Sequence, residues 1–357
     1  MNYAVVMAGG SGTRFWPVSR AHLPKQLLPI FGDDVLLVQT MKRLEPLLPP
    51  ERVLIVTGVA IADKISRALP GLPAANLIAE PLRRNTAPCA AVAAKLLADR
   101  DPDAVLALLP ADHTIRRPEV FREVLAAACQ LAAREEVLIT LGIAPDFPET
   151  GYGYIEMADR LGRENGQPYH RVAAFHEKPR AERAQAFLAA GSFLWNSGIF
   201  FFRAATFLAA VQEHLPDLWA RIADLSGTEP PAEIERRLEE IYPRIEGVSI
   251  DVGVMEKVDN LVVFPADIGW SDVGSWTAIR ELHPADENHN VAHGDAVILD
   301  GANNTVFACD GVVVALGVDD LIVVHTPDAT LVARRDDAQA VKKVFDELER
   351  RGLTKYL

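Results

Sequence analysis

The sequence contains few cysteines and no long apolar run. Its three cysteines, Cys89, Cys129 and Cys309, are widely spaced, and no CxxC pair or Cys/His ligand spacing accompanies them. This pattern predicts buried free thiols in a reducing compartment and argues against a disulfide framework or a zinc site. No run of about 18 uninterrupted apolar residues is present, and no charged and apolar leader precedes the first predicted strand. We therefore expect a cytoplasmic protein with no membrane partner.

Positive charge is also in short supply, because 36 Lys and Arg face 49 Asp and Glu and the net charge is −13. This balance argues against nucleic acid and anionic membranes as general partners, since both are polyanions. With 49% hydrophobic and 24% charged residues, the composition is that of an ordinary folded protein. The 357 residues are enough for one large domain and a smaller one. An anionic small molecule would need a local positive pocket.

The first 32 residues have no acidic side chain. An even spread of the 49 acids would place about four there, yet the first is Asp33. A predicted buried strand ends in Ala8-Gly9-Gly10-Ser11-Gly12-Thr13, and Arg14 and Lys25 follow. Small residues let backbone N–H groups approach a ligand closely, so this segment predicts a phosphate site. The loop fits neither the dinucleotide fingerprint nor the P-loop pattern, and its structural alternative is an ordinary tight turn.

Strand-like and helix-like segments alternate through the first 145 residues. Continuous apolar runs, typical of parallel strands covered on both faces, occur at 53–57, 76–80, 104–110 and 137–143. Helical spacing occurs at 36–48, 61–69, 86–100 and 119–135. This order predicts an α/β fold with an open, doubly wound, Rossmann-like sheet. Ligands bind beyond the carboxyl ends of such strands, so Gly9-Gly10, Glu80-Pro81 and Pro110-Ala111-Asp112 are expected at one crevice.

The pattern changes after residue 150. Segments 151–157 and 171–179 alternate like antiparallel strands, which predicts a mixed sheet, and two helices are expected between 204 and 243. After about residue 284, short apolar runs separated by turn residues predict a small β-solenoid, followed by a closing amphipathic helix. The predicted domains are therefore 1–283 and 284–357.

Seven motifs carry a resemblance to a known family. The stretch AGGSGTRFWPVSRAHLPKQ resembles the signature of the sugar-1-phosphate nucleotidylyltransferases, and its Pro24-Lys25-Gln26 ending is similar to members that make GDP-mannose. The resemblance continues in order through EPLRRNTAP (80–88), LPADH (109–113), TGYGYI (150–155), FHEKP (175–179), WNSGIFFF (195–202) and DIGWSDVGSW (267–276). It implies a nucleotidyltransferase domain followed by a short left-handed β-helix that mediates homodimer contacts.

The resemblance implies transfer of GMP from GTP to α-D-mannose 1-phosphate by direct in-line attack, with Mg²⁺ as cofactor and pyrophosphate as second product. The second pKa of a sugar phosphate is about 6, so the attacking oxygen is mostly ionised at pH 7 without a general base. No convincing Ser/His/Asp set is present. The obstacle is repulsion between two polyanions, about 4 kcal/mol per pair of like charges about 4 Å apart at an effective dielectric of 20. Basic side chains and a divalent ion would offset it.

The resemblance also assigns the site residues. It implies catalytic Arg14, Lys25, Asp112 and Lys178; nucleotide-binding Ala8, Gly9, Gly10, Gly12, Thr13, Arg14, Lys25, Asn85, Thr86 and Pro110; sugar-phosphate-binding Gly153, Glu177, Lys178 and Asn196; and Mg²⁺ ligands Asp112 and Asp272. Structural alternatives stay open for several of them. The aspartates and Asn196 also suit turns or caps, and Asn85 and Thr86 suit a cap of helix 86–100.

Three further expectations concern neighbours of these residues. Glu177 and Lys178 should alternate along a strand and face opposite sides unless Pro179 bends the chain. His176 stands where the family motif more usually carries a small apolar residue. Asp251 and Asp267 are expected to have no functional role.

Two other functions remain open from the sequence. Another sugar 1-phosphate or another nucleotide could be the substrate, because residue types alone do not distinguish guanine from thymine or mannose from glucose. The chain could also be a non-catalytic GDP-mannose-binding regulator, although the joint presence of Arg14, Lys25, Asp112 and Asp272 argues against this. Longer relatives carry an appended mannose-6-phosphate isomerase domain, so a chain of 357 residues is expected to have the transferase activity alone.

Overall fold

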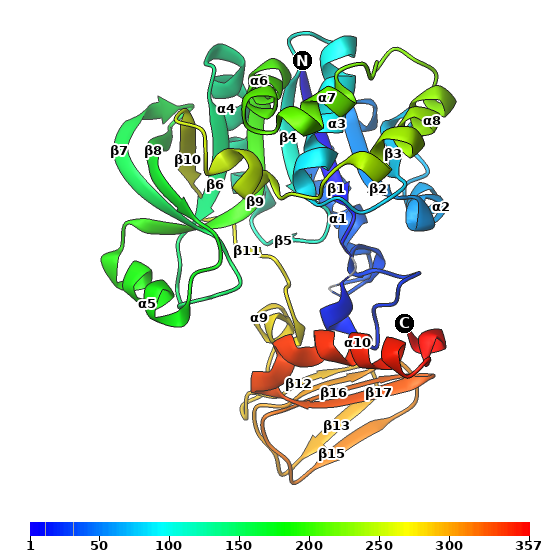
Figure 1. The fold of residues 1–357 in the computed structure, drawn as a ribbon. Coiled ribbons are helices and arrows are strands. Elements are labelled where there is room, and N and C mark those ends of the chain that lie inside the picture. The colour runs from blue at the N-terminus through cyan, green and yellow to red at the C-terminus, as the bar shows by residue number, and fades with distance from the viewer. Residues whose placement is uncertain (11, 31) are drawn as a thin grey trace. The chain divides into compact units, whose positions relative to one another are not determined.

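A computed structural model describes residues 1–10, 12–30 and 32–357 (Figure 1). Ser11 of the predicted phosphate loop lies outside these described residues. Contacts divide the chain into two compact units. Unit 1 comprises Met1–Gly9, Met41–Ala111 and Ile115–Trp270, and unit 2 comprises Gly10–Thr40, Asp112–Thr114 and Ser271–Leu357. These units differ from the predicted domains 1–283 and 284–357, because the loop after Gly9 groups with the C-terminal segment.

Unit 1 is built on one mixed sheet. Its order is β3-β2-β1-β4-β9-β6-β10-β8-β7. The strands are β1 (Asn2–Ala8), β2 (Val53–Gly58), β3 (Leu77–Glu80), β4 (Val105–Pro110), β6 (Leu138–Ile143), β7 (Tyr154–Glu164), β8 (Gln167–His176), β9 (Phe193–Arg203) and β10 (Leu261–Pro265). The first four run parallel, as predicted, and β9 runs antiparallel between β4 and β6. The short strands β5 (Thr114–Ile115) and β11 (Trp270–Ser271) lie where the chain passes between the units.

Helices cover both faces of the central strands. Val5 and Leu106 belong to the core that includes α3, and their neighbours Val6 and Ala107 are equally buried on the other side. Helix α4 packs against β4 and β9. This burial explains why the strands are continuous apolar runs, and it confirms the predicted α/β fold. The helices are α1 (Leu36–Leu44), α2 (Val59–Ala68), α3 (Thr86–Arg100), α4 (Pro118–Arg134), α5 (Ala181–Ala190), α6 (Ala204–His214), α7 (Pro216–Ile222), α8 (Pro231–Ile241), α9 (Ile279–Leu282) and α10 (Lys342–Arg350).

The expectation of two helices between residues 204 and 243 is wrong, because this fully described segment forms three. Pro216 occupies the first position of α7 and ends α6 at His214, and Pro231 begins α8 in the same way. Proline favours a first helical position because it has no N–H to leave unpaired.

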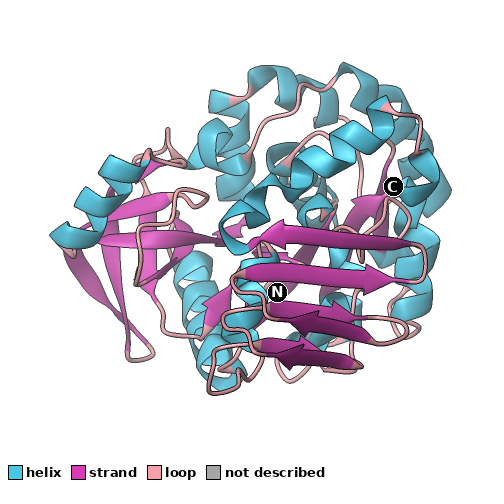
Figure 2. Cartoon of the chain, turned by 90° about the horizontal axis from the view of Figure 1, so that it is seen from below, coloured by secondary structure: helices cyan, strands magenta, loops and turns pink. Residues whose placement is uncertain are grey.

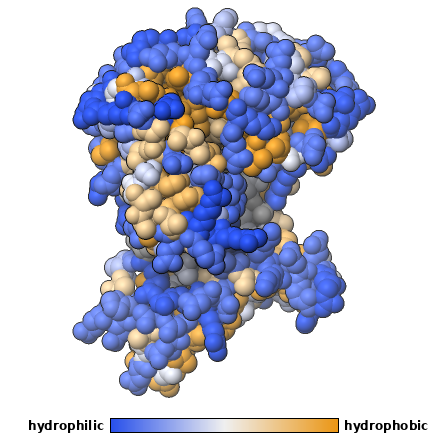
Figure 3. All heavy atoms as spheres, turned by 60° about the vertical axis from the view of Figure 1, so that its left-hand side comes forward, coloured by the Kyte–Doolittle hydropathy of each residue, from blue (hydrophilic) through white to orange (hydrophobic). Residues whose placement is uncertain are grey.

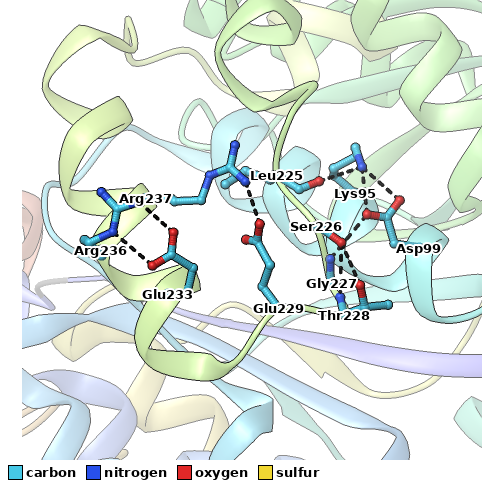
Figure 4. Close-up of polar contacts among 10 residues, drawn as sticks. All are labelled: Lys95, Asp99, Leu225, Ser226, Gly227, Thr228, Glu229, Glu233, Arg236 and Arg237. Carbon is cyan, nitrogen blue, oxygen red and sulfur yellow. Dashed lines mark hydrogen bonds and ion pairs between the residues drawn. The ribbon is translucent and has the colours of Figure 1, made fainter.

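The loop between α7 and α8 is fastened to α3 (Figure 4). The Lys95 ammonium donates to the Leu225 carbonyl at 2.6 Å and to Asp99 at 2.8 Å, and Asp99 accepts from the Gly227 N–H at 3.3 Å. A β-carbon at Gly227 would lie 1.8 Å from the Leu96 carbonyl oxygen, closer than any real contact. Glycine is therefore required here for steric reasons.

Gly227→Ala is expected to lower the free energy of unfolding by about 1–3 kcal/mol, the usual cost of inserting a methyl group into a closely packed position. Urea unfolding followed by circular dichroism measures it. Gly71→Ala is the matched control, since a β-carbon there would meet nothing within 4 Å. Equal stability of the two variants would contradict the close approach of the loop to α3.

Unit 2 contains the predicted β-solenoid (Figure 2). Its strands are β12 (Val291–His293), β13 (Ala296–Leu299), β14 (Thr305–Ala308), β15 (Val313–Leu316), β16 (Leu321–Thr326) and β17 (Ala329–Arg334). Strands β12, β14 and β16 pair in parallel, β13 pairs in parallel with β15, and β17 closes the sheet antiparallel to β16. Parallel pairing of successive short strands is the geometry of a solenoid.

The core of unit 2 joins the two ends of the sequence. Phe15 and Trp16 are buried with Trp276 and Phe307, and the Trp16 indole N–H donates to the Tyr356 carbonyl at 2.8 Å. These aromatic contacts are the reason the segment after Gly9 belongs to this unit.

Cys89 and Cys129 are buried as expected, but the expectation is wrong for Cys309, which is exposed. In the described part of the chain, every helix is too short or too polar to cross a membrane.

Candidate active site

Lys25 is the centre of the predicted phosphate site in unit 2. Its side chain is buried, and its Nζ lies 2.9 Å from Asp112 Oδ2 and donates to the backbone carbonyl of Asp272 at 2.6 Å. A buried ammonium is stable only when it is paired and hydrogen-bonded. Lys25 therefore connects the two aspartates predicted to bind Mg²⁺, one through its side chain and the other through its backbone.

The Asp112 carboxylate is held in its charged form. Burial is the largest influence and would raise its pKa, but the nearby Lys25 ammonium and His113 together outweigh it, so the pKa lies below the ordinary value. The nearer His113 ring nitrogen lies 3.9 Å from Asp112 Oδ1. An ionised carboxylate is the oxygen ligand that Mg²⁺ prefers.

Gly12 and Lys25 approach each other closely. Gly12 has a φ of 61°, and a β-carbon there would lie 2.5 Å from Lys25 Cβ. Only glycine meets both conditions, which gives a physical reason for the glycine in the loop. The Ser19 hydroxyl donates to the Gly12 carbonyl at 2.7 Å and fixes the turn. A β-carbon at Gly10 would lie 4.0 Å from Asp112 Oδ2, so this glycine also lies beside the Asp112 carboxylate.

Arg14 and Asp272 both lie close to Gly274. A β-carbon at Gly274 would lie 2.8 Å from Asp272 Oδ2 and 3.3 Å from an Arg14 guanidinium nitrogen. The Arg14 side chain is exposed and donates to Gln339 at 3.2 Å. Its guanidinium is thus available at the surface of unit 2, beside a predicted metal ligand. Thr13 adjoins it, in the short helix Thr13–Phe15.

The backbone is strained beside this site. Val273 has a φ of 48°, which is unusual for a β-branched residue. Its side chain is fully buried. Such a conformation costs about 1–3 kcal/mol and persists only where the surroundings impose it. Lys178 (φ 42°) and Asn85 (φ 67°) also have a positive φ. Each of these three residues is a predicted site residue or is adjacent to one in the sequence.

The predicted sugar-phosphate residues lie together in unit 1. A β-carbon at Gly153 would lie 3.0 Å from Glu177 Oε2 and 3.4 Å from Asn196 Cβ, and the Asn196 N–H donates to the Gly153 carbonyl at 2.8 Å. The absence of a side chain at Gly153 therefore lets both Glu177 and Asn196 lie close to its backbone. The Lys178 ammonium lies 2.9 Å from Glu177 Oε1.

Glu177 and Lys178 do not alternate along a strand, so the exception expected for a bend at Pro179 applies. Strand β8 ends at His176, and the two side chains pair with each other in the following loop. Pro179 disfavours ordinary helical backbone at Lys178, which instead adopts a positive φ. His176 has a packing role, since its ring stacks on Phe187 with the centroids 5.0 Å apart.

Asp251 contacts the predicted sugar-phosphate residues, although no sequence pattern assigned it a function. The Asn196 amide Nδ2 donates to Asp251 Oδ1 at 2.8 Å. Burial, followed by the nearby Glu177 charge, raises the pKa of Asp251 to about 6. The only sequence signal was a single aspartate in SID (249–251), 55 positions from its partner. Asp267 is exposed and paired with Arg117, as expected of a surface residue.

The remaining predicted residues lie at the ends of parallel strands or at the start of α3. Ala8 and Pro110 end β1 and β4, and Asn85 caps α3 by accepting from the Thr86 N–H at 2.9 Å. The cap alternative is therefore confirmed for Asn85. Thr86 Oγ1 accepts from the Ile250 N–H at 2.9 Å. This bond ties the start of α3 to the segment that carries Asp251.

Glu80 is a second buried carboxyl at these strand ends. Its Oε1 accepts from the Tyr242 hydroxyl at 2.7 Å, and a β-carbon at Gly9 would lie 3.8 Å from Oε2. Burial raises the pKa of Glu80 to about 7, although the Tyr242 hydrogen bond acts in the opposite direction. The folded chain therefore binds this proton more tightly than the unfolded chain, and its stability falls as the pH rises from about 4.5 to 7.

Glu80→Gln removes this pH-dependent cost. The shift corresponds to about 3 kcal/mol, so the variant should be more stable than the parent at pH 8 by up to that amount and should show no gain near pH 4.5. Urea unfolding at the two pH values measures the difference. The exposed Glu213→Gln is the control and should show no such pH dependence. A Glu80→Gln variant that gains no stability at pH 8 would contradict the raised pKa.

The donors around Lys25 fit Mg²⁺. Within the described residues, no group of three or more His, Cys, Asp or Glu side chains has the arrangement of an all-protein metal centre. Mg²⁺ needs no such group, because one or two carboxylates commonly hold it together with water and substrate phosphates. Asp112 would supply an ionised carboxylate to such an ion, and Asp272 of the same unit would be the second candidate ligand.

Comparisons with known proteins agree over nearly the whole chain. Residues 3–289 match the model of the nucleotidyl transferase family, and residues 294–348 match that of the MannoseP isomerase/GMP-like beta-helix domain. A solved structure from Thermus thermophilus, described as a mannose-1-phosphate geranyltransferase, superposes with a TM-score of 0.88. It is 36% identical and covers 98% of this chain and 99% of its own.

Curated relatives are similarly close. The mannose-1-phosphate guanylyltransferase ManC of Salmonella typhimurium is 41% identical, with 98% of this chain and 74% of the relative aligned. The mannose-1-phosphate guanylyltransferase of Escherichia coli K12 is 40% identical over the same shares. The alginate biosynthesis protein AlgA of Pseudomonas aeruginosa is 37% identical, with 98% of this chain and 72% of AlgA aligned. The chain therefore belongs to the mannose-1-phosphate guanylyltransferases, within the nucleotidyl transferase family.

Proposed function

We propose that this chain transfers GMP from GTP to α-D-mannose 1-phosphate, giving GDP-mannose and pyrophosphate. The proposed reaction is inferred from membership of the family. The observation that supports the residue roles is the buried Lys25 ammonium between Asp112 and the Asp272 backbone, beside the glycine loop. The reaction needs fixed positive charge because both substrates are anions.

In the proposed mechanism, a phosphate oxygen of the sugar 1-phosphate attacks the α-phosphorus of GTP directly. The bond between the α-phosphorus and the bridging oxygen breaks, and pyrophosphate leaves with both bonding electrons. The glycine-loop amides, Arg14 and Lys25 hold the triphosphate, and Lys178 holds the sugar phosphate. Asp112 and Asp272 would hold Mg²⁺, which neutralises phosphate charge when bound. No covalent enzyme intermediate is required.

The sugar is proposed to bind at the set around Gly153. Glu177 and Asn196 both lie close to this glycine, and their carboxylate and amide groups can accept from and donate to the hydroxyl groups of a hexose. Asn85 and Thr86 are proposed to contact the nucleotide as well as cap α3. A cytoplasmic location, expected from the sequence, stays part of this proposal.

Pyrophosphate release across a panel of nucleoside triphosphates and sugar 1-phosphates tests the function. The expected result is the highest kcat/KM for GTP with mannose 1-phosphate. A higher value for another pair would reassign the substrates. Tight GDP-mannose binding without pyrophosphate release from any pair would support the regulator instead.

We also propose that the chain forms a homodimer through the β13–β15 face. Val297 is paired in register with Val314, and Leu299 with Leu316, and all four side chains are exposed by 42–63%. Apolar atoms are visible at the lower end of Figure 3, where these strands lie in Figure 1. An apolar face is complementary to a second copy of itself. Light scattering of the parent protein should give twice the chain mass. The double variant Val314→Lys with Leu316→Lys should give the mass of the monomer. A double variant that keeps the mass of the dimer would exclude this face as the interface.

A further inference from the structure

Asp251 is held in place from two sides within unit 1. It begins a π-helical turn, Asp251–Met255, an element that is rare and frequently found at functional sites. The preceding Ile250 N–H donates to Thr86 Oγ1 at 2.9 Å, and the Ala87 N–H donates to the Val248 carbonyl at 3.1 Å. On its other side, Asp251 Oδ1 accepts from the Asn196 amide at 2.8 Å. The carboxylate therefore has a defined position between the start of α3 and β9.

The Asn196 amide has a single orientation because of these bonds. Its Oδ1 accepts from the Thr140 hydroxyl at 3.1 Å and from the Gly198 N–H at 3.2 Å. Both lone pairs of that oxygen are thus used, and the amide nitrogen points to Asp251. Asn196 has one N–H left for a ligand and no free acceptor. An acceptor for a sugar hydroxyl must come from a neighbouring side chain.

A carboxylate is a costly residue at this position. Burial and the neighbouring Glu177 charge both oppose its ionisation. An asparagine could accept the same bond from Asn196 through its side-chain oxygen without this cost. The Asn196 bond alone therefore does not require a charge at this position, although the nearby Lys178 charge favours the ionised form. Groups with perturbed ionisation are concentrated at functional sites. The carboxylate accepts from Asn196 and from its own backbone N–H, which leaves lone pairs of its two oxygens to accept from a ligand.

We propose that Asp251 binds a hydroxyl group of the sugar and, with Glu177, sets the orientation of the sugar phosphate. This inference rests on the proposed sugar site around Gly153. Two neighbouring carboxylates can both accept from a vicinal diol, whose two hydroxyls donate one hydrogen bond each. The same charges repel phosphate. Lys178, which pairs with Glu177 at 2.9 Å, therefore marks the phosphate end, and Asp251 marks the hydroxyl end.

Asp251→Asn tests this assignment by steady-state kinetics. The KM for mannose 1-phosphate is expected to rise about 10- to 100-fold, the loss typical of a hydrogen bond to a charged group, while the KM for GTP stays within about twofold. The melting temperature at pH 8 should rise, because the variant no longer buries a charge. The exposed Asp259→Asn is the control and should leave both KM values unchanged.

Deoxy analogues of mannose 1-phosphate separate binding from a merely structural role. The parent should lose kcat/KM with the analogue that lacks the hydroxyl bound by Asp251, and Asp251→Asn should be insensitive to that same deletion. An active parent whose Asp251→Asn variant keeps its KM and its response to every deoxy analogue would overturn this inference and leave the proposed function intact. A parent that neither releases pyrophosphate nor binds mannose 1-phosphate in calorimetry would overturn both.

Discussion

Replacing Lys25 by methionine should reduce the turnover of GTP with mannose 1-phosphate by about 100- to 1000-fold. Removal of one preorganised donor aimed at developing charge typically costs that much. Methionine keeps the apolar length of the side chain at a position that is only 5% exposed, so the loss reports the missing ammonium. Steady-state pyrophosphate release measures it, and circular dichroism checks the fold.

Lys343→Met is the matched control, because Lys343 is an exposed lysine of the same unit. It should retain the parent rate. Arginine is not expected to rescue position 25, since the stem lies against Gly12 and the ammonium is buried. Turnover close to that of the parent in Lys25→Met would remove this residue from the mechanism.

Asp112→Asn should have an effect of similar size, about 100- to 1000-fold on turnover. A neutral amide is a weaker ligand for Mg²⁺ than a carboxylate and leaves the Lys25 ammonium without its counter-charge. The Mg²⁺ concentration at half-maximal rate should rise as well. Metal titration of the rate, together with calorimetric Mg²⁺ binding in the presence of GTP, measures both.

The exposed Asp267→Asn separates a site effect from a general charge effect. Asp267 lies in the same DIGWSD motif as Asp272 but pairs with Arg117 at the surface. It should leave both the rate and the Mg²⁺ dependence unchanged. An Asp112→Asn variant with the Mg²⁺ dependence of the parent would show that Asp112 is not a ligand.

Local elements of the fold could be predicted because their signals are local. Helix α3 begins and ends at the expected residues, since Asn85 caps it and an alanine-rich run follows. The place of β9 between β4 and β6 could not be predicted, because the choice of strand partner depends on contacts far apart in sequence. The grouping of Phe15 and Trp16 with Trp276 escaped prediction for the same reason.

In the candidate site, too, local motifs could be predicted and contacts between distant residues could not. Motifs identified Lys25, Asp112 and Glu177 as residue types suited to phosphate, metal and sugar. Pro179 indicated only that the chain could bend there, and the motifs did not show that the Lys178 ammonium pairs with Glu177. Asp251 was missed because a lone aspartate has no spacing pattern, and only folding brings it to Asn196.

Shortening this chain at residue 283 would not yield a minimal enzyme. Such a truncated protein would retain every assigned side chain, yet Phe15 and Trp16 would lose Phe307 and the Tyr356 carbonyl, against which they pack or bond. The segment bearing Gly12 and Lys25 would then expose its aromatic side chains to water. The β-solenoid is in this sense a folding scaffold for the phosphate loop.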